Sequence, residues 1–108
     1  MTQQEMVLNI RYDAPKEIWD KIPAIYEQLN GWIGFGQGGQ SGEEGIPYWF
    51  SFNRNEKHIL ASLEPSGLQF TGLMETQEWI NWIKEIKQIS TRAFGFKVGE
   101  IESGEVEY

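Results

Sequence analysis

The stretch Pro47-Tyr-Trp-Phe-Ser-Phe-Asn-Arg-Asn-Glu-Lys-His-Ile-Leu-Ala-Ser-Leu-Glu-Pro-Ser-Gly-Leu-Gln-Phe-Thr-Gly72 decides the fold class of this chain. It contains three runs of aromatic and branched apolar residues, at 47–52, 58–63 and 68–72, and each run is typical of a β-strand. Short segments rich in Asn, Pro, Ser and Gly separate the runs and are typical of turns. Strands joined by such short turns pair with their chain neighbours, so the stretch predicts an antiparallel sheet with a hairpin of 47–52 and 58–63.

A helical pattern follows a first predicted strand at residues 6–12. Asp13 is the predicted N-cap of this helix, because an acceptor side chain at that position binds the first free backbone N–H groups. Apolar residues then recur at helical spacing up to Gly31, which ends the helix. Pro23 lies inside the pattern and has no N–H, so a kink or break is predicted there. A short strand is predicted next, at 32–35.

A second helical pattern begins after the predicted sheet region. Thr76 is its predicted N-cap, and an apolar stripe runs from Trp79 to Ala93 with charged residues on the other side. Strands clustered in the chain with helices outside them predict an α+β fold. We expect one domain over residues 1–108, with two helices packed on one face of an antiparallel sheet and a loose C-terminal end at 103–108.

Cysteine and histidine usage limits the chemistry that the chain can perform. The absence of cysteine excludes disulfides and thiolate metal sites, and a single histidine, His58, excludes a site built from several histidines. A Ser-His-acid set would need Ser62 and Glu64, but on a strand His58 and Ser62 lie roughly 13 Å apart. Glutamate pairs for acid–base catalysis stay open, although no spacing marks one out. No catalytic residue, metal or other cofactor is predicted, and we do not expect an enzyme.

The charge balance is strongly acidic. Nine Lys and Arg stand against sixteen Asp and Glu, for a formal net charge of −7, and no dense run of Lys and Arg occurs. Phosphate backbones and anionic lipids attract basic surfaces, so neither nucleic acid nor membrane is a predicted partner. The two interpretations left open are plain solubility and a basic protein partner. The N-terminus lacks signal-peptide character, so the expected location is the cytoplasm.

The C-terminal run Lys97-Val-Gly-Glu-Ile-Glu-Ser-Gly-Glu-Val-Glu-Tyr108 is the first candidate for a partner-binding surface. Its glutamates alternate with small or apolar residues, as on one face of an extended segment. Val98 and Ile101 could dock part of the run as an edge strand, which predicts an ordered row of carboxylates beside the sheet. The predicted partner-binding residues of this run are Glu100, Glu102, Glu105 and Glu107.

A glycine-rich segment between Gly31 and Gly45 is the second candidate. Gly34-Phe-Gly-Gln-Gly-Gly39 formally matches the dinucleotide fingerprint, but the sequence after it does not begin the helix that a pyrophosphate needs. We therefore expect an exposed loop, and because glycine lets a backbone approach a partner closely, the loop is also a candidate binding loop. Its predicted contact residues are Glu43 and Glu44.

Aromatic residues on the predicted strand 47–52 point to both faces. Tyr48, Phe50 and Phe52 share one face, whereas Trp49 points to the other. An exposed Trp49 beside the glycine-rich loop is a predicted binding anchor. The alternative is that a loop or a terminus covers Trp49.

Two resemblances add to this interpretation. The segments His58–Phe70, Glu78–Trp82 and Phe94–Glu102 resemble those of small acidic bacterial immunity proteins, which neutralise polymorphic or contact-dependent toxins by direct binding. This resemblance is one of general style over about half the chain, with no shared catalytic residues, and it implies a non-enzymatic inhibitor. The segment Asp13–Asp20 is similar to the opening of START-like helix-grip domains, which implies a ligand cavity.

The leading hypothesis is an immunity-type protein that neutralises a basic toxin domain. Its proposed mechanism is electrostatic steering followed by steric blockade. The alternative is a small-ligand-binding or small enzymatic domain with an aromatic pocket lined by Tyr48, Phe50 or Trp82. A homo-oligomer that buries the face of Trp49 is the third hypothesis.

Overall fold

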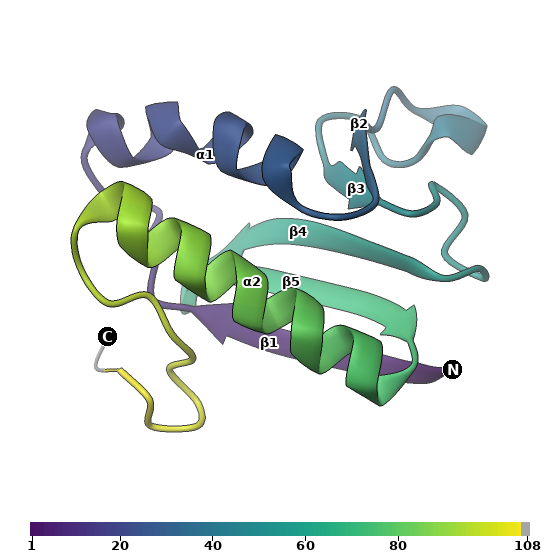
Figure 1. The fold of residues 1–108 in the computed structure, drawn as a ribbon. Helices are drawn as coiled ribbons and strands as arrows, with labels where there is room; N and C mark the ends of the chain where they lie inside the picture. The colour runs from purple at the N-terminus through teal and green to yellow at the C-terminus, as the bar shows by residue number, and fades with distance from the viewer. Residues whose placement is uncertain (107–108) are drawn as a thin grey trace.

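One five-stranded antiparallel sheet and two helices form a single α+β domain (Figure 1). The computed structural model describes residues 1–106. The strands are β1 (Thr2–Leu8), β2 (Trp32–Phe35), β3 (Pro47–Trp49), β4 (His58–Glu64) and β5 (Gly67–Met74), in the spatial order β1-β5-β4-β3-β2. The helices are α1 (Lys16–Gln28) and α2 (Thr76–Phe94), and a short 3-10 helix, η1 (Gly39–Ser41), lies between β2 and β3. The predicted fold class is confirmed.

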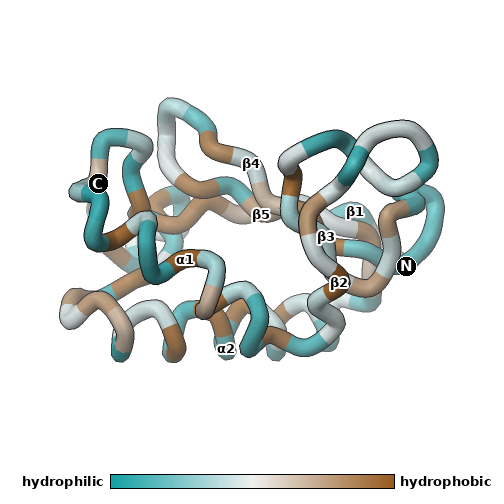
Figure 2. The backbone as a smooth tube through the Cα atoms, turned by 90° about the horizontal axis from the view of Figure 1, so that it is seen from above, coloured by the Kyte–Doolittle hydropathy of each residue, from teal (hydrophilic) through white to brown (hydrophobic). Residues whose placement is uncertain are grey.

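Both helices lie on the same side of the strands, as the view from above shows (Figure 2). Their apolar stripes meet the sheet face that carries Trp49 and Phe70. The Trp49 ring packs edge-on against Tyr26 of α1 at 4.9 Å between centroids and against Trp82 of α2 at 5.0 Å. Its Nε1 donates a hydrogen bond to the Tyr26 carbonyl oxygen at 3.2 Å. This single side chain therefore joins the two helices to the sheet.

The expected exposure of Trp49 is wrong. Trp49 is 0% exposed, because its face of the sheet is the one that the helices cover. Tyr48 on the opposite face is buried too, under the glycine-rich loop. Phe50 has a positive φ of 73°, which breaks the expected alternation and ends β3 at Trp49 rather than at residue 52.

The helix boundaries differ from the predicted ones at their starts. Pro15 precedes the first residue of α1, and Asp13 instead accepts a hydrogen bond from Arg11 Nε at 3.0 Å. α1 continues through Pro23 as one helix, so no break occurs there. Thr76 is the first residue of α2 and not its N-cap; its Oγ1 accepts a hydrogen bond from Gln4 Nε2 at 3.3 Å. In the described residues, no helix is both long and apolar enough to cross a membrane.

β1 begins four residues earlier than predicted because β5 sets its register. The pairing runs from Thr2 opposite Met74 to Leu8 opposite Leu68, and the chain leaves the sheet at Asn9. The glycine-rich loop is folded and not only exposed: Gly36 N donates to the Ile46 carbonyl at 2.7 Å, and Gly36 and Gly42 are buried.

Candidate functional site

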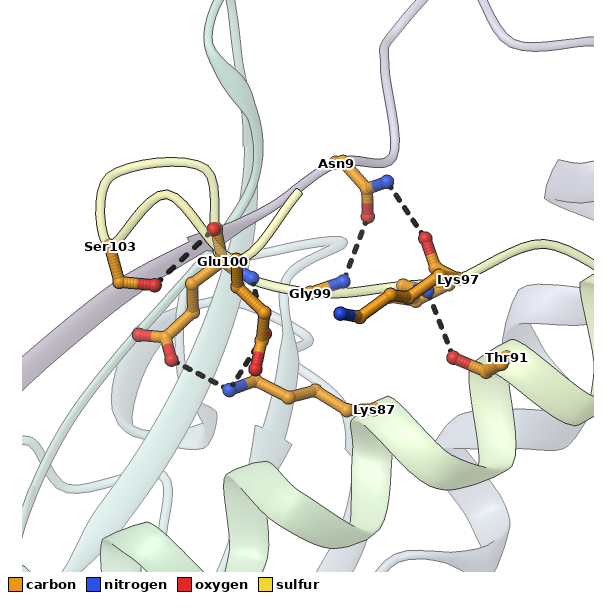
Figure 3. Close-up of polar contacts among 9 residues, drawn as sticks. Asn9, Lys87, Thr91, Lys97, Gly99, Glu100 and Ser103 are labelled. Atoms are coloured by element: carbon orange, nitrogen blue, oxygen red, sulfur yellow. Dashed lines mark hydrogen bonds and ion pairs between the residues drawn. The ribbon is translucent and has the colours of Figure 1, made fainter. Parts of the chain in front are cut away.

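The segment after α2 docks on the outer edge of β1, where Asn9 holds it (Figure 3). Asn9 Nδ2 donates to the Lys97 carbonyl at 3.0 Å, and Gly99 N donates to Asn9 Oδ1 at 3.0 Å. An isolated antiparallel bridge then pairs Leu8 with Glu100. These contacts fix the direction in which residues 97–106, here called the acidic run, leave α2.

Lys87 of α2 gathers two carboxylates of the acidic run (Figure 3). Its Nζ lies 2.6 Å from Glu100 Oε2 and 3.2 Å from Glu105 Oε1, and the Lys87 side chain is 19% exposed. Partial burial alone would lower the pKa of Lys87, but the hydrogen bonds with Glu100 and Glu105 outweigh it and raise that pKa. The backbone N–H of Glu100 donates to Glu105 at 2.9 Å, and this bond, followed by the contact with Lys87, lowers the pKa of Glu105.

The predicted row of carboxylates is therefore wrong in its arrangement. Only Glu100 forms a strand-like pair, and the chain then turns through 101–104. The turn brings Glu105 back beside Glu100 and leaves Glu102 exposed, so Glu105 is anchored although residues from 103 on were expected to be loose. Glu107, also predicted to bind a partner, lies outside the described residues.

The two glutamates of the glycine-rich loop differ in their surroundings. Glu43 Oε2 accepts a hydrogen bond from Arg54 Nη2 at 3.0 Å, and Glu43 N donates to the Tyr48 hydroxyl at 3.1 Å. Glu43 therefore helps to fold the loop over Tyr48. Glu44 is exposed, and in the described part of the chain no cation lies at ion-pair distance from it.

A groove of about 910 Å³ separates α2 from the docked acidic run. The cations that line it are Lys84, Lys87, Arg92 and Lys97. Exposed Ile80 and buried Ile83 contribute apolar wall. The sequence shows no dense basic run, because these four cations are spread over fourteen positions and the fold alone brings them to one groove.

A second opening of about 330 Å³, here called the α1–β4 cleft, lies where the sheet splits. Trp19 and Pro23 of α1 form one wall, and Phe35 and Leu63 contribute exposed apolar surface. Tyr48 of β3 pairs with Leu60 of β4. Pro47, the residue before Tyr48, has no N–H to donate to β4. The carbonyl of Ile46, one residue earlier again, accepts a hydrogen bond from Gly36 and none from β4. β3 therefore leaves β4 before Ala61.

Three free carboxylates adjoin residues that line this cleft. Over residues 1–106, the carboxylates without a cation at ion-pair distance are Glu5, Glu17, Glu27, Glu44, Glu56, Glu64, Glu85 and Glu102. Glu27, Glu44 and Glu64 each follow or precede a residue that lines the cleft. The neighbouring cation Lys21 donates to the Ala93 carbonyl at 3.0 Å, at the far end of α2. The sequence pattern did not indicate this cleft, because its walls come from five separate elements, α1, β2, β3, β4 and β5.

The remaining candidates form no comparable constellation. His58 is buried, and its Nδ1 lies 2.8 Å from the Glu56 carbonyl oxygen, whereas Ser62 Oγ donates to Glu64 at 3.0 Å. The hollow beside Phe50 and Trp82 has a volume of only about 190 Å³.

Comparison of the chain with models of known protein families, with curated proteins and with solved structures gives no match. The function is therefore inferred from the groove beside α2, the α1–β4 cleft and the free carboxylates of the surface.

Proposed function

We propose that this chain is a non-enzymatic, cytoplasmic binding protein that captures a basic protein and neutralises it as an immunity-type inhibitor. The main support for this proposal is an excess of free carboxylates over free cations on the described surface. Eight carboxylates have no cation at ion-pair distance, against four cations with no carboxylate, namely Lys21, Lys84, Arg92 and Lys97. An unbalanced surface of this sign attracts a cationic protein over a longer range than a surface of matched pairs.

Binding would begin with steering and end with desolvation. Free carboxylates such as Glu44 and Glu102 raise the rate of encounter with a basic surface, and this effect falls with ionic strength. Exposed apolar side chains, above all Phe35 and Leu63, then slow dissociation when the partner covers them. Inhibition follows if the covered surface of the partner includes its active site.

The alternative of a small-ligand or enzymatic pocket has weaker support. Tyr48 and Trp82 are buried in packed aromatic clusters. The hollow beside Phe50 is smaller than the roughly 300–1,000 Å³ of ordinary ligand pockets. For a homo-oligomer, the face of Trp49 is not available, since the helices of the same chain already cover it.

The test is capture followed by titration with purified components. The immobilised chain is exposed to extract of its native host at about 50 mM salt, and each captured protein is purified and titrated at about 50 and about 500 mM salt. The proposal predicts a basic protein whose association rate falls by roughly tenfold or more at the higher salt. The chain should also inhibit the activity or toxicity of that protein at equal stoichiometry.

Two results would contradict the proposal. One is that every protein captured and purified is neutral or acidic. The other is that a basic protein binds with no dependence on salt and keeps its full activity in the complex.

A further inference from the structure

Over residues 1–106, the side of β4 that faces β3 has no paired strand along the α1–β4 cleft. β4 pairs with β5 over its whole length, from His58 to Glu64, but with β3 only at Ile59 and Leu60. In the described chain, no strand pairs with the β3 side of Ala61–Glu64. An unpaired strand edge offers backbone donors and acceptors to another extended segment.

The helix wall of the cleft also carries unmet polar groups. Pro23 has no N–H, so the Trp19 carbonyl lacks the donor that an α-helix normally supplies four residues later. Trp19 and Pro23 both line the cleft, because residues four apart share a helix face. The Trp19 Nε1 is buried and has no acceptor in the described structure. Buried polar groups are usually satisfied, so this unmet donor marks Trp19, a residue of the cleft wall, as a position where a bound segment could supply an acceptor.

Apolar surface stands at the mouth of the same cleft. Phe35 is 42% exposed and Leu63 is 48% exposed. Both side chains lie on the sheet face toward α1, where their neighbours Ala61 and Leu68 are buried. A single apolar side chain inserted between them would remove this surface from water.

The carboxylates around the cleft favour a bound segment with basic residues on both sides of its apolar residue. Glu27 lies one turn after Pro23 on α1, Glu44 adjoins the lining residue Gly45, and the Glu64 carboxylate is held 3.0 Å from Ser62 of the cleft wall. None of the three forms an ion pair with another residue of 1–106. An apolar residue with Lys or Arg on each side therefore matches both the wall and the rim.

We propose that the α1–β4 cleft binds an extended basic segment of the partner protein, which adds as a short strand along Ala61–Glu64. About four residues of the segment pair with β4, and alternate side chains point toward α1 and into solvent. One apolar side chain packs against Trp19, Phe35 and Leu63. The long Lys or Arg side chains on either side of it bend around the rim of the cleft toward Glu27, Glu44 and Glu64. This inference rests on the proposed capture of a basic protein and assigns its docking site.

The test uses ¹⁵N-labelled full-length chain and four synthetic peptides. The probe is the blocked heptapeptide Lys-Val-Lys-Leu-Lys-Val-Lys, and its controls replace every Lys by Glu, replace Leu by Ser, or carry N-methyl groups on alternate amides. The probe should shift the amide resonances of Ala61–Glu64 and the indole N–H resonance of Trp19. The acidic and Ser peptides should leave these resonances in place, and the N-methylated peptide should bind at least tenfold more weakly because it cannot pair with the edge.

Matched variants separate the cleft from general acidity. The triple change Glu27→Gln, Glu44→Gln and Glu64→Gln should weaken probe binding about tenfold. The control triple Glu5→Gln, Glu85→Gln and Glu102→Gln removes the same charge away from the cleft and should change it less than twofold. Leu63→Asn should weaken binding, whereas Ile80→Asn, in the groove beside α2, should not. The carboxylates of the five substituted glutamates other than Glu64 accept no hydrogen bond in the described structure, and each variant is first checked for an unchanged spectrum.

The possible outcomes are distinct. Three results would overturn the inference. The first is that the probe shifts only resonances of the groove beside α2, and the second is that the two triple variants have equal effects. The third is that the resonances of Ala61–Glu64 move only with the concentration of the chain itself, which would assign the cleft to a second copy. If a captured basic protein binds Leu63→Asn as tightly as the wild type, the cleft is wrong but the proposed function stands. If no basic protein is captured, the proposed function fails whatever the peptides do.

Discussion

The ammonium of Lys87 lies 2.6 Å from the carboxylate of Glu100, and this pair closes the acidic run against α2. Glu105 completes the cluster at 3.2 Å from the same nitrogen. Two of the carboxylates that the sequence offers as a binding surface thus stabilise the fold. The carboxylates that remain free to meet a partner are instead those of residues such as Glu27, Glu44, Glu64 and Glu102.

Lys87→Met should lower the free energy of unfolding by about 1 kcal/mol, because two partly exposed carboxylates lose their cation. The measurement is urea denaturation followed by tryptophan fluorescence. Lys84→Met is the control, since Lys84 lines the same groove without an ion partner in the described residues. Equal losses in the two variants would show that the cluster adds nothing to stability.

The contribution of this cluster should depend on pH at both ends of the scale. The pKa of Glu105 is lowered from 4.5, so its contribution is present above pH 4.5 and is lost as the pH falls through the lower folded value. The pKa of Lys87 is raised from 10.5, so its contribution is present below pH 10.5 and is lost as the pH rises through the higher folded value. The stability difference between wild type and Lys87→Met should be constant between these limits and shrink outside them. A difference that varies through pH 6–8 would contradict the assignment.

Trp49→Phe should destabilise the domain without weakening capture of the partner. The change leaves a cavity between the helices and the sheet and removes the donor to the Tyr26 carbonyl, for a loss of about 2–3 kcal/mol. Partner affinity is measured well below the melting temperature of the variant. A large loss of affinity in a fully folded variant would return Trp49 to the binding surface.

Gly42→Ala should cost more stability than Gly38→Ala. Both glycines have positive φ, at 81° and 90°, so both changes carry a similar backbone strain. A Cβ at Gly42 would lie 2.7 Å from the Tyr48 ring and 2.8 Å from the Phe52 ring, whereas nothing lies within 4 Å of one at Gly38. The extra loss should be about 1–3 kcal/mol in thermal or urea unfolding. Equal losses would mean that the loop does not pack on Tyr48 as described.

The sequence predicted the elements better than their limits. Periodicity placed both helices and the strands at 32–35 and 58–63, because these segments bury one consistent face. It placed the end of β3 too late, since nothing local signals the positive φ of Phe50. The start of β1 depends on the pairing of Thr2 with Met74 of β5, 72 positions away in the chain, and so no local pattern could fix it.

The candidate binding surfaces were harder to predict than the fold. Alternating glutamates look like an exposed row until Lys87, thirteen residues before Glu100, turns two of them inward. The α1–β4 cleft depends on Pro47 and Pro23, two prolines that each remove a backbone donor at the same opening. Such convergence is a property of the tertiary structure and leaves no spacing rule in the chain.

Electrostatic steering is tested by the association rate of the captured basic protein, measured by stopped flow from about 50 to about 500 mM salt. Wild type, the Glu27/Glu44/Glu64→Gln triple variant and the Glu5/Glu85/Glu102→Gln triple variant are compared side by side. Electrostatic steering by the free carboxylates predicts a steep fall with salt for the wild type. It also predicts a slower rate at low salt, with a flatter dependence, for the first triple variant than for the second. Rates that are independent of salt, and identical in all three proteins, would contradict it.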